Sequence, residues 1–171
     1  AVPAQSPAAV GGLKVGDKIT SVNGVDVGKD INPLHLTEHL EQFAGQEVEI
    51  AVKRTVVGSP KLETVTVKLT PNDTPSWMDY PLSEGTPLAI PSIGVAYHLT
   101  SNVLRVLPGS PAANASVPEG IALESIRIES ENETFKKIAR QSSVDIKFDD
   151  PTRKSMAYAL WQIQEVPDAK V

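Results

Sequence analysis

Apolar and polar residues alternate along two stretches between residues 48 and 69, and this alternation predicts a β-hairpin. A period of two is typical of a half-buried strand. Because the turn-forming residues 58–60 (Gly-Ser-Pro) stand between the two stretches, we expect the strands to pair. The alternating apolar positions are Val48, Ile50, Val52, Val65, Val67 and Leu69.

A shorter hairpin is predicted ahead of this one. Residues 18–22 alternate in the same way, and residues 25–27 can form a short return strand. Asn23 and Gly24 stand between them, and an Asn-Gly pair favours the tight turn that joins antiparallel strands.

Two short helices are predicted by a capping residue followed by proline. Ser6 and Asn32 each precede a proline, and proline is well tolerated at the first helical position because its missing N–H has no partner there. The second helix carries apolar residues on one face. These residues are Leu36, Leu40 and Phe43. Short helices among antiparallel strands predict a mainly β fold of the α+β class.

The first cap motif occurs twice in the chain. Ser6-Pro7-Ala8-Ala9 returns as Ser-Pro-Ala-Ala at residues 110–113, an offset of 104 residues. At the same offset Gly16 corresponds to Gly120, Ile19 to Leu123 and Val22 to Ile126. A spacing of this size is too long for a solenoid repeat, so we interpret it as a duplicated small domain.

Proline, glycine and polar residues break the pattern over residues 71–87, which we interpret as a linker. We therefore expect a first domain at residues 1–70 and a second, divergent domain at residues 88–171. The second copy has an insertion near residues 130–149, with an extra strand predicted at residues 144–148. Its last helix carries Met156, Leu160 and Ile163 on one face.

Composition excludes several classes of function. The net charge of −5 argues against nucleic acid and against anionic lipid, since both need basic surfaces. The chain has no cysteine, so disulfides and thiolate metal sites are excluded. Its apolar stretches are far shorter than the roughly 18 residues of a transmembrane helix.

Residues 6–24 resemble the signature of bacterial PDZ domains in residue types, spacing and order of elements. They read Ser-Pro-Ala-Ala, then Gly-Leu-Lys-Val-Gly-Asp-Lys-Ile, then Ser-Val-Asn-Gly. The resemblance implies two partly open antiparallel barrels with the permuted strand order of bacterial PDZ domains. It also implies that a partner peptide adds as an extra strand beside a glycine-containing loop and packs on the second helix. By the same resemblance, the first copy lacks this loop and strand before Ser6, and the second lacks its closing hairpin. We therefore expect either a trimmed chain or strands shared between neighbouring copies of the chain.

The PDZ resemblance implies a set of peptide-binding residues. Residues 92–95 (Ser-Ile-Gly-Val) match the loop that points backbone N–H groups at a peptide carboxylate, and Gly94 permits close backbone approach. The expected site residues are Ser92, Ile93, Gly94, Val95, Ala96, Tyr97, Met156, Tyr158, Leu160, Leu36, His39 and Leu40.

The tandem arrangement resembles the PDZ pair of bacterial site-2 proteases, which are membrane-embedded zinc metalloproteases of regulated intramembrane proteolysis. This resemblance implies a substrate-recognition or size-filter segment on the periplasmic side of the inner membrane. Its partners are then C-terminal or extended segments of substrates and the parent's transmembrane catalytic domain. The chain has no His-Glu-x-x-His motif, so we expect no catalytic residue, metal or cofactor here, and zinc only in the parent's catalytic domain.

Two alternatives remain open. One is the PDZ pair of a periplasmic serine protease or of a carboxyl-terminal processing protease. The other, of a different class, is a zinc hydrolase centred on His35 and His39, because His-x-x-Glu-His places two imidazoles on one helical face with Glu38 as the base.

Overall fold

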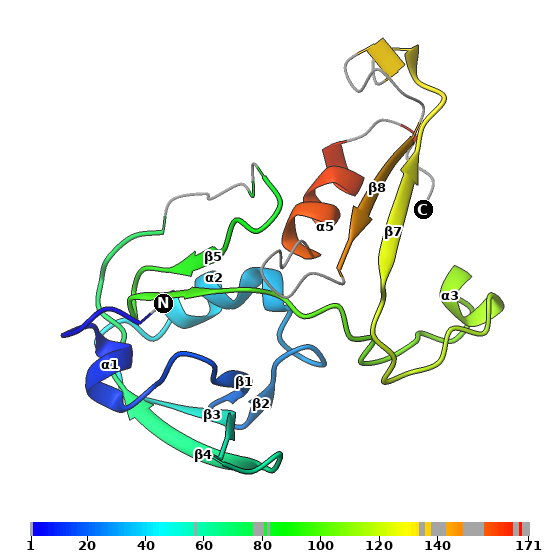
Figure 1. The fold of residues 1–171 in the computed structure, drawn as a ribbon. Coiled ribbons are helices and arrows are strands. Elements are labelled where there is room, and N and C mark those ends of the chain that lie inside the picture. Colours follow the sequence, from blue (N-terminus) through cyan, green and yellow to red (C-terminus); the bar gives the residue numbers. More distant parts are fainter. Residues whose placement is uncertain are drawn as a thin grey trace. The chain divides into compact units, whose positions relative to one another are not determined.

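The predicted hairpin forms the long strands of a four-stranded sheet (Figure 1). β3 (Val48–Thr55) and β4 (Leu62–Leu69) are antiparallel and pair over their full length, with Ile50 opposite Val67. β1 (Lys18–Val22) pairs with the other side of β3 and with β2 (Val25–Asp26), so the order is β2-β1-β3-β4. Asn23 and Gly24 in the β1–β2 turn have φ values of 49° and 78°, which is the left-handed conformation that the Asn-Gly pair predicts.

The computed structural model describes residues 2–56, 58–76, 81, 83–133, 136–137, 143–148, 156–165 and 168. Short helices and mostly antiparallel strands confirm the α+β class. The chain divides into two compact units. The first unit is Ala1–Asp79 with Ala89–Tyr97, and the second is Tyr80–Leu88 with His98–Val171. The remaining elements are α1 (Pro7–Gly11), η1 (Pro33–His35), α2 (Leu36–Glu41), β5 (Leu88–Ile90), β6 (Val95–Tyr97), α3 (Pro111–Asn114), β7 (Ser125–Glu129), β8 (Ser143–Lys147) and α5 (Met156–Glu165).

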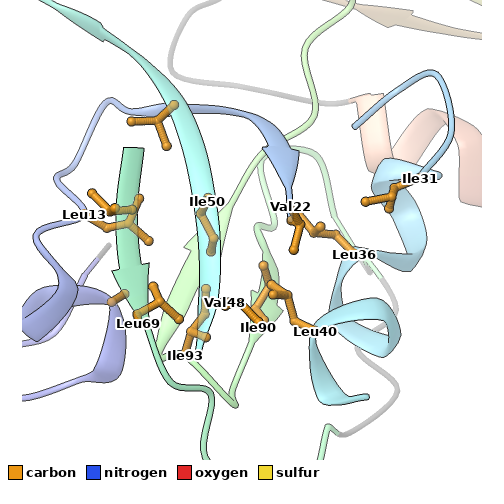
Figure 2. Close-up of a cluster of buried hydrophobic side chains, with 13 residues drawn as sticks. Leu13, Val22, Ile31, Leu36, Leu40, Val48, Ile50, Leu69, Ile90 and Ile93 are labelled. Atoms are coloured by element: carbon orange, nitrogen blue, oxygen red, sulfur yellow. The ribbon is translucent and has the colours of Figure 1, made fainter. Parts of the chain in front are cut away.

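One hydrophobic core holds the first unit together, and it includes residues from after the expected linker. Ile90 and Ile93 are completely buried in it, and Figure 2 shows both pointing into the cluster with Val48 and Leu40. The segment Ala89–Tyr97 is therefore part of the first unit's core. The buried members of the cluster are Ala8, Leu13, Val22, Ile31, Leu36, Leu40, Val48, Ile50, Val52, Val67, Leu69, Ile90 and Ile93.

The unit boundary therefore differs from the expected one, which gave all of residues 88–171 to the second domain. The physical reason is that Ile90 and Ile93 complete the apolar interior of the first unit. Two backbone hydrogen bonds fix the segment there: the Ala8 N–H donates to the Ile93 carbonyl at 3.0 Å, and the Asn72 N–H donates to the Ser92 carbonyl at 2.8 Å.

The second unit contains a separate hairpin and a helix. β7 and β8 pair antiparallel with Ile126 opposite Ile146, so the strand predicted inside the insertion is present. Ile128, Ile146 and Ala159 form the buried centre of a small core against which α5 packs. The order Asp150-Pro151 also predicts a cap for this helix by the same cap-and-proline pattern, and these two residues lie outside the described part of the chain.

The two copies of the cap motif have the same local structure. The Ser6 and Ser110 side chains accept hydrogen bonds from the Ala9 and Ala113 N–H groups at 3.1 and 3.2 Å. Four backbone hydrogen bonds of the first copy also recur 104 residues later. Their acceptor carbonyls belong to Pro3, Ser6, Ala8 and Ala9 in the first copy and to Leu107, Ser110, Ala112 and Ala113 in the second. The left-handed residues Gln5, Gly12 and Gly16 correspond to Gly109, Ser116 and Gly120. The surroundings of the two motifs differ, because Ile93 packs against the first one only.

A bidentate ion pair fastens the turn before β1 to β3. The Arg54 guanidinium donates to both oxygens of Asp17 at 2.7 and 2.8 Å and to the Gly12 carbonyl at 2.9 Å. The Asp17 side chain is 4% exposed and also accepts the Lys14 N–H. The hydrogen bond from Arg54 holds the pKa of Asp17 below its ordinary value.

This ion pair predicts a loss of stability in acid. A carboxyl whose pKa is lower in the folded than in the unfolded state stabilises the fold. This stabilisation is complete at pH values above the unfolded-state pKa of 3.8, and it is lost as the pH falls towards and through the lower pKa of the folded state. We expect Asp17→Asn to lower the free energy of unfolding by about 1–3 kcal/mol at pH 6 and by much less at pH 2.5. Urea unfolding at both pH values measures this, with the exposed Asp73→Asn as control. An equal loss at both pH values would contradict a role for the Asp17 charge.

No helix among the described residues has the length and the apolar character needed to cross a bilayer.

Candidate peptide-binding site

The predicted glycine-containing loop forms a tight turn between β5 and β6. These two strands are hydrogen-bonded neighbours in a two-stranded sheet. Gly94 has a φ of 69°, and its N–H donates to the carbonyls of Ile90 at 2.9 Å and Pro91 at 3.0 Å. The Ile93 N–H also donates to the Ile90 carbonyl, at 3.3 Å. The amides of Ile93 and Gly94 therefore close the turn itself.

Glycine is required at position 94 for two reasons. The left-handed φ strains any residue with a side chain. In addition, a Cβ atom at Gly94 would lie 2.5 Å from the Cβ of Ser6, closer than two carbon atoms can approach. The loop thus packs directly on the α1 cap motif, which begins about ninety positions earlier in the chain.

The consecutive helices η1 and α2 are each held beside the β5–β6 hairpin by one hydrogen bond. The Thr37 hydroxyl donates to the Ala89 carbonyl at 2.7 Å, and the Tyr97 hydroxyl donates to the Pro33 carbonyl at 2.8 Å. Burial raises the pKa of Tyr97 to about 12, so its hydroxyl keeps the proton that it donates at neutral pH. The start of the helical segment and the end of β6 are therefore fixed relative to each other.

The predicted residues of α2 occupy different environments. Leu36 and Leu40 are 2% and 0% exposed, so they belong to the core rather than to an open surface. His39 is half-buried, with its ring edge-on to Phe43 at a centroid distance of 5.6 Å. Its Nε2 atom is buried and has no hydrogen-bond partner among the described residues. Of the predicted α2 residues, His39 is therefore the one whose side chain has a polar atom without a hydrogen bond among the described residues.

The predicted residues of α5 lie in the other unit. Met156 is 8% exposed, and Tyr158 stands at a tilt to Trp161 with centroids 6.1 Å apart. Tyr158 packs against the second unit's core. The structure thus places the loop residues 92–97 and the α2 residues in one unit, and Met156, Tyr158 and Leu160 in another.

Thr37, Pro33 and Ala89 join the loop to the helix but were not predicted from the sequence. No local pattern marks them, because each acts through one hydrogen bond to a residue more than fifty positions away. The peptide-binding role of the twelve predicted residues stays a prediction.

The histidine pair shows no metal-binding geometry in the described residues. The His35 Nδ1 atom lies 3.5 Å from the Glu38 Oε1 atom, and both side chains are exposed. No group of three or more His, Cys, Asp or Glu residues within the described ranges could hold a metal ion.

The comparisons with known proteins bear on the first unit. Residues 1–54 match a family model described as PDZ domain. Among the curated proteins, none matches the chain. The matched residues contain α1, the β1–β2 hairpin, α2 and most of β3. The chain therefore contains a PDZ domain at residues 1–54, of the kind that generally mediates peptide binding.

Proposed function

We propose that the first unit binds an extended segment of a partner protein as an added strand alongside β6. Among the described strands β6 pairs with one neighbour, β5, so it stands at the edge of a two-stranded sheet. Such an edge is a template for an added strand, and backbone pairing supplies the affinity of β-augmentation. The position of β6 at the edge of this sheet, fixed next to η1 by the Tyr97 hydroxyl, is the observation that carries the proposal.

The loop favours an internal segment over a chain terminus. Capture of a carboxylate needs N–H groups that point away from the loop. The N–H groups of Ile93 and Gly94 instead donate to carbonyls inside the turn. We therefore expect amidated and free-acid forms of one peptide to bind equally well, with dissociation constants on the order of micromolar or weaker.

Peptides with blocked backbone N–H groups test strand addition. A displayed library of random peptides of about ten residues supplies the starting ligand. N-methylation of alternate residues removes the N–H groups on one side of the peptide strand. We expect one set of alternate methylations to abolish binding in a fluorescence anisotropy titration, because those N–H groups bond to β6. The other set serves as the matched control and should bind as before. Equal binding by both methylated peptides would exclude strand addition.

We further propose that the chain is the substrate-recognition or size-filter segment of a site-2-type zinc metalloprotease. The support is the tandem sequence resemblance at residues 6–24 and 92–113, and the PDZ match at residues 1–54. In this proposal the segment lies on the periplasmic side of the membrane, and the zinc belongs to the parent's catalytic domain. The parent's sequence on either side of this chain tests it. Apolar spans with His-Glu-x-x-His are expected, whereas a serine protease domain would overturn it.

A further inference from the structure

The β1–β2 turn contains the chain's one asparagine that is followed by glycine. Asn23 and Gly24 are both exposed, and no atom lies within 4 Å of the position of a Cβ on Gly24. Asparagine is a labile residue in proteins, and a following glycine makes it most reactive because no side chain hinders the backbone nitrogen. The other five asparagines precede proline, aspartate, valine, alanine and glutamate.

The reaction open to such a pair is deamidation. The Gly24 backbone nitrogen loses its proton to the solvent and attacks the Asn23 side-chain carbon Cγ. The carboxamide nitrogen takes up a proton and leaves as ammonia, so a succinimide ring closes between the two residues. Water then opens the ring at either of its carbonyl carbons and gives aspartate or isoaspartate. Water is consumed and ammonia released in equal amounts, with no oxidant or reductant.

The folded turn holds the side chain away from this path. The Asn23 Oδ1 atom accepts the Glu49 N–H at 2.9 Å, and the Asn23 N–H donates to the Glu49 carbonyl at 2.8 Å. Val22, which precedes Asn23, is completely buried and pairs with Ile50 in β3. Ring closure requires the carboxamide to rotate toward the Gly24 nitrogen, which breaks its bond to Glu49. The reaction therefore needs the turn to open first.

We propose that Asn23 is a modification site at which deamidation records opening of the β1–β2 turn and then makes it permanent. In the closed turn the carboxamide is bonded to β3, and in an opened molecule it is free to meet the Gly24 nitrogen. The rate in the native state is then the rate of the open chain multiplied by the open fraction.

Isoaspartate prevents the turn from closing as before. Its peptide bond runs through the side-chain carbon, so the backbone of the turn gains one carbon atom. The turn pairs Val22 directly with Val25, and a hairpin register of this kind is set by the length of its loop. Aspartate keeps the backbone length and an oxygen that accepts the Glu49 N–H. We therefore expect isoaspartate, rather than aspartate, to weaken the first unit.

Peptide mapping by mass spectrometry tests the first step on the wild-type chain at pH 8, in buffer and in urea. In urea Asn23 should react faster than every other asparagine. In buffer it should react at least about tenfold more slowly than in urea, because the closed turn protects it. Equal rates in buffer and in urea would overturn the proposal, and so would a faster reaction at another asparagine in urea.

Two valine variants test whether opening limits the reaction. Val22→Ala loosens the closed turn and should speed the reaction in buffer by about tenfold, because Val22 is 0% exposed. Val15→Ala is the matched control and should react at the wild-type rate, because Val15 is 78% exposed. Equal rates for the two variants would contradict the proposal.

A further variant keeps the test decisive if Val22→Ala does not fold. Gly24→Ala, measured in urea, places a β-carbon beside the attacking nitrogen, so the reaction at Asn23 should slow several-fold. An unchanged rate would exclude the route through the Gly24 nitrogen.

The isoaspartate form, separated by ion exchange, tests the second step. It should unfold at a lower urea concentration than Asn23→Asp, which carries the same charge on a backbone of normal length. Equal unfolding midpoints would show that the modification does not fix the turn open.

Discussion

Ile93→Ala is expected to lower the free energy of unfolding of the first unit by about 2–5 kcal/mol. Ile93 is completely buried in a cluster whose other buried members, apart from Ile90, all precede it by more than twenty positions. Its truncation removes apolar contacts and leaves a cavity in a core that is already closed around it. Urea unfolding followed by circular dichroism measures the loss.

Leu107→Ala is the control for this prediction. This substitution also removes a large apolar side chain, but Leu107 is 58% exposed. The free energy of unfolding should therefore change by no more than about 0.5 kcal/mol. If Ile93→Ala were as mild as this control, the segment Ala89–Tyr97 would not belong to the first unit's core in solution.

Gly94→Val is expected to be at least as damaging, and to remove peptide binding as well. The left-handed φ of 69° costs about 1–3 kcal/mol for a β-branched residue. The new Cβ atom also meets Ser6 at 2.5 Å, and relief of that overlap moves the loop off α1 at a further cost of about 1–3 kcal/mol. Thermal unfolding gives the stability, and peptide titration gives the binding.

Gly58→Val separates the two costs. Gly58 has a φ of 80°, and no atom lies within 4 Å of the position of its Cβ, so this variant meets only the backbone strain. We expect Gly94→Val to be more destabilising than Gly58→Val by the cost of the overlap. Equal effects at both glycines would show that the loop is not held against Ser6.

Local structure could be predicted from the sequence wherever a few neighbouring residues determine it. Ser6 and Asn32 accept the capping hydrogen bonds that their place before proline predicts. Asn23 and Gly24 adopt the left-handed turn, and the strands of residues 48–69 pair in one continuous register. In each case the information lies within about ten residues, where propensity and periodicity act.

The place of the loop could not be predicted in this way. Residues 92–95 stand shortly before Ser110, so their position in the chain favoured packing with the second motif. Since the two motifs have the same backbone, nothing local shows which one receives the loop. The choice depends on how completely Ile90 and Ile93 fill the space between α2 and β3, which is a property of the folded core. The same limit explains why Met156, Tyr158 and Leu160 were grouped with a loop of the other unit.

The discontinuous first unit has a consequence for synthesis on the ribosome. After Leu69 has been made, the nascent chain still lacks the residues that close the interior around Leu40 and Ile50. At about 5–20 residues per second, Tyr97 follows a few seconds later, and it must also clear the exit tunnel. During that interval the half-made interior is open to chaperones and to neighbouring nascent chains, so the pace of translation between these two points influences the yield of folded protein.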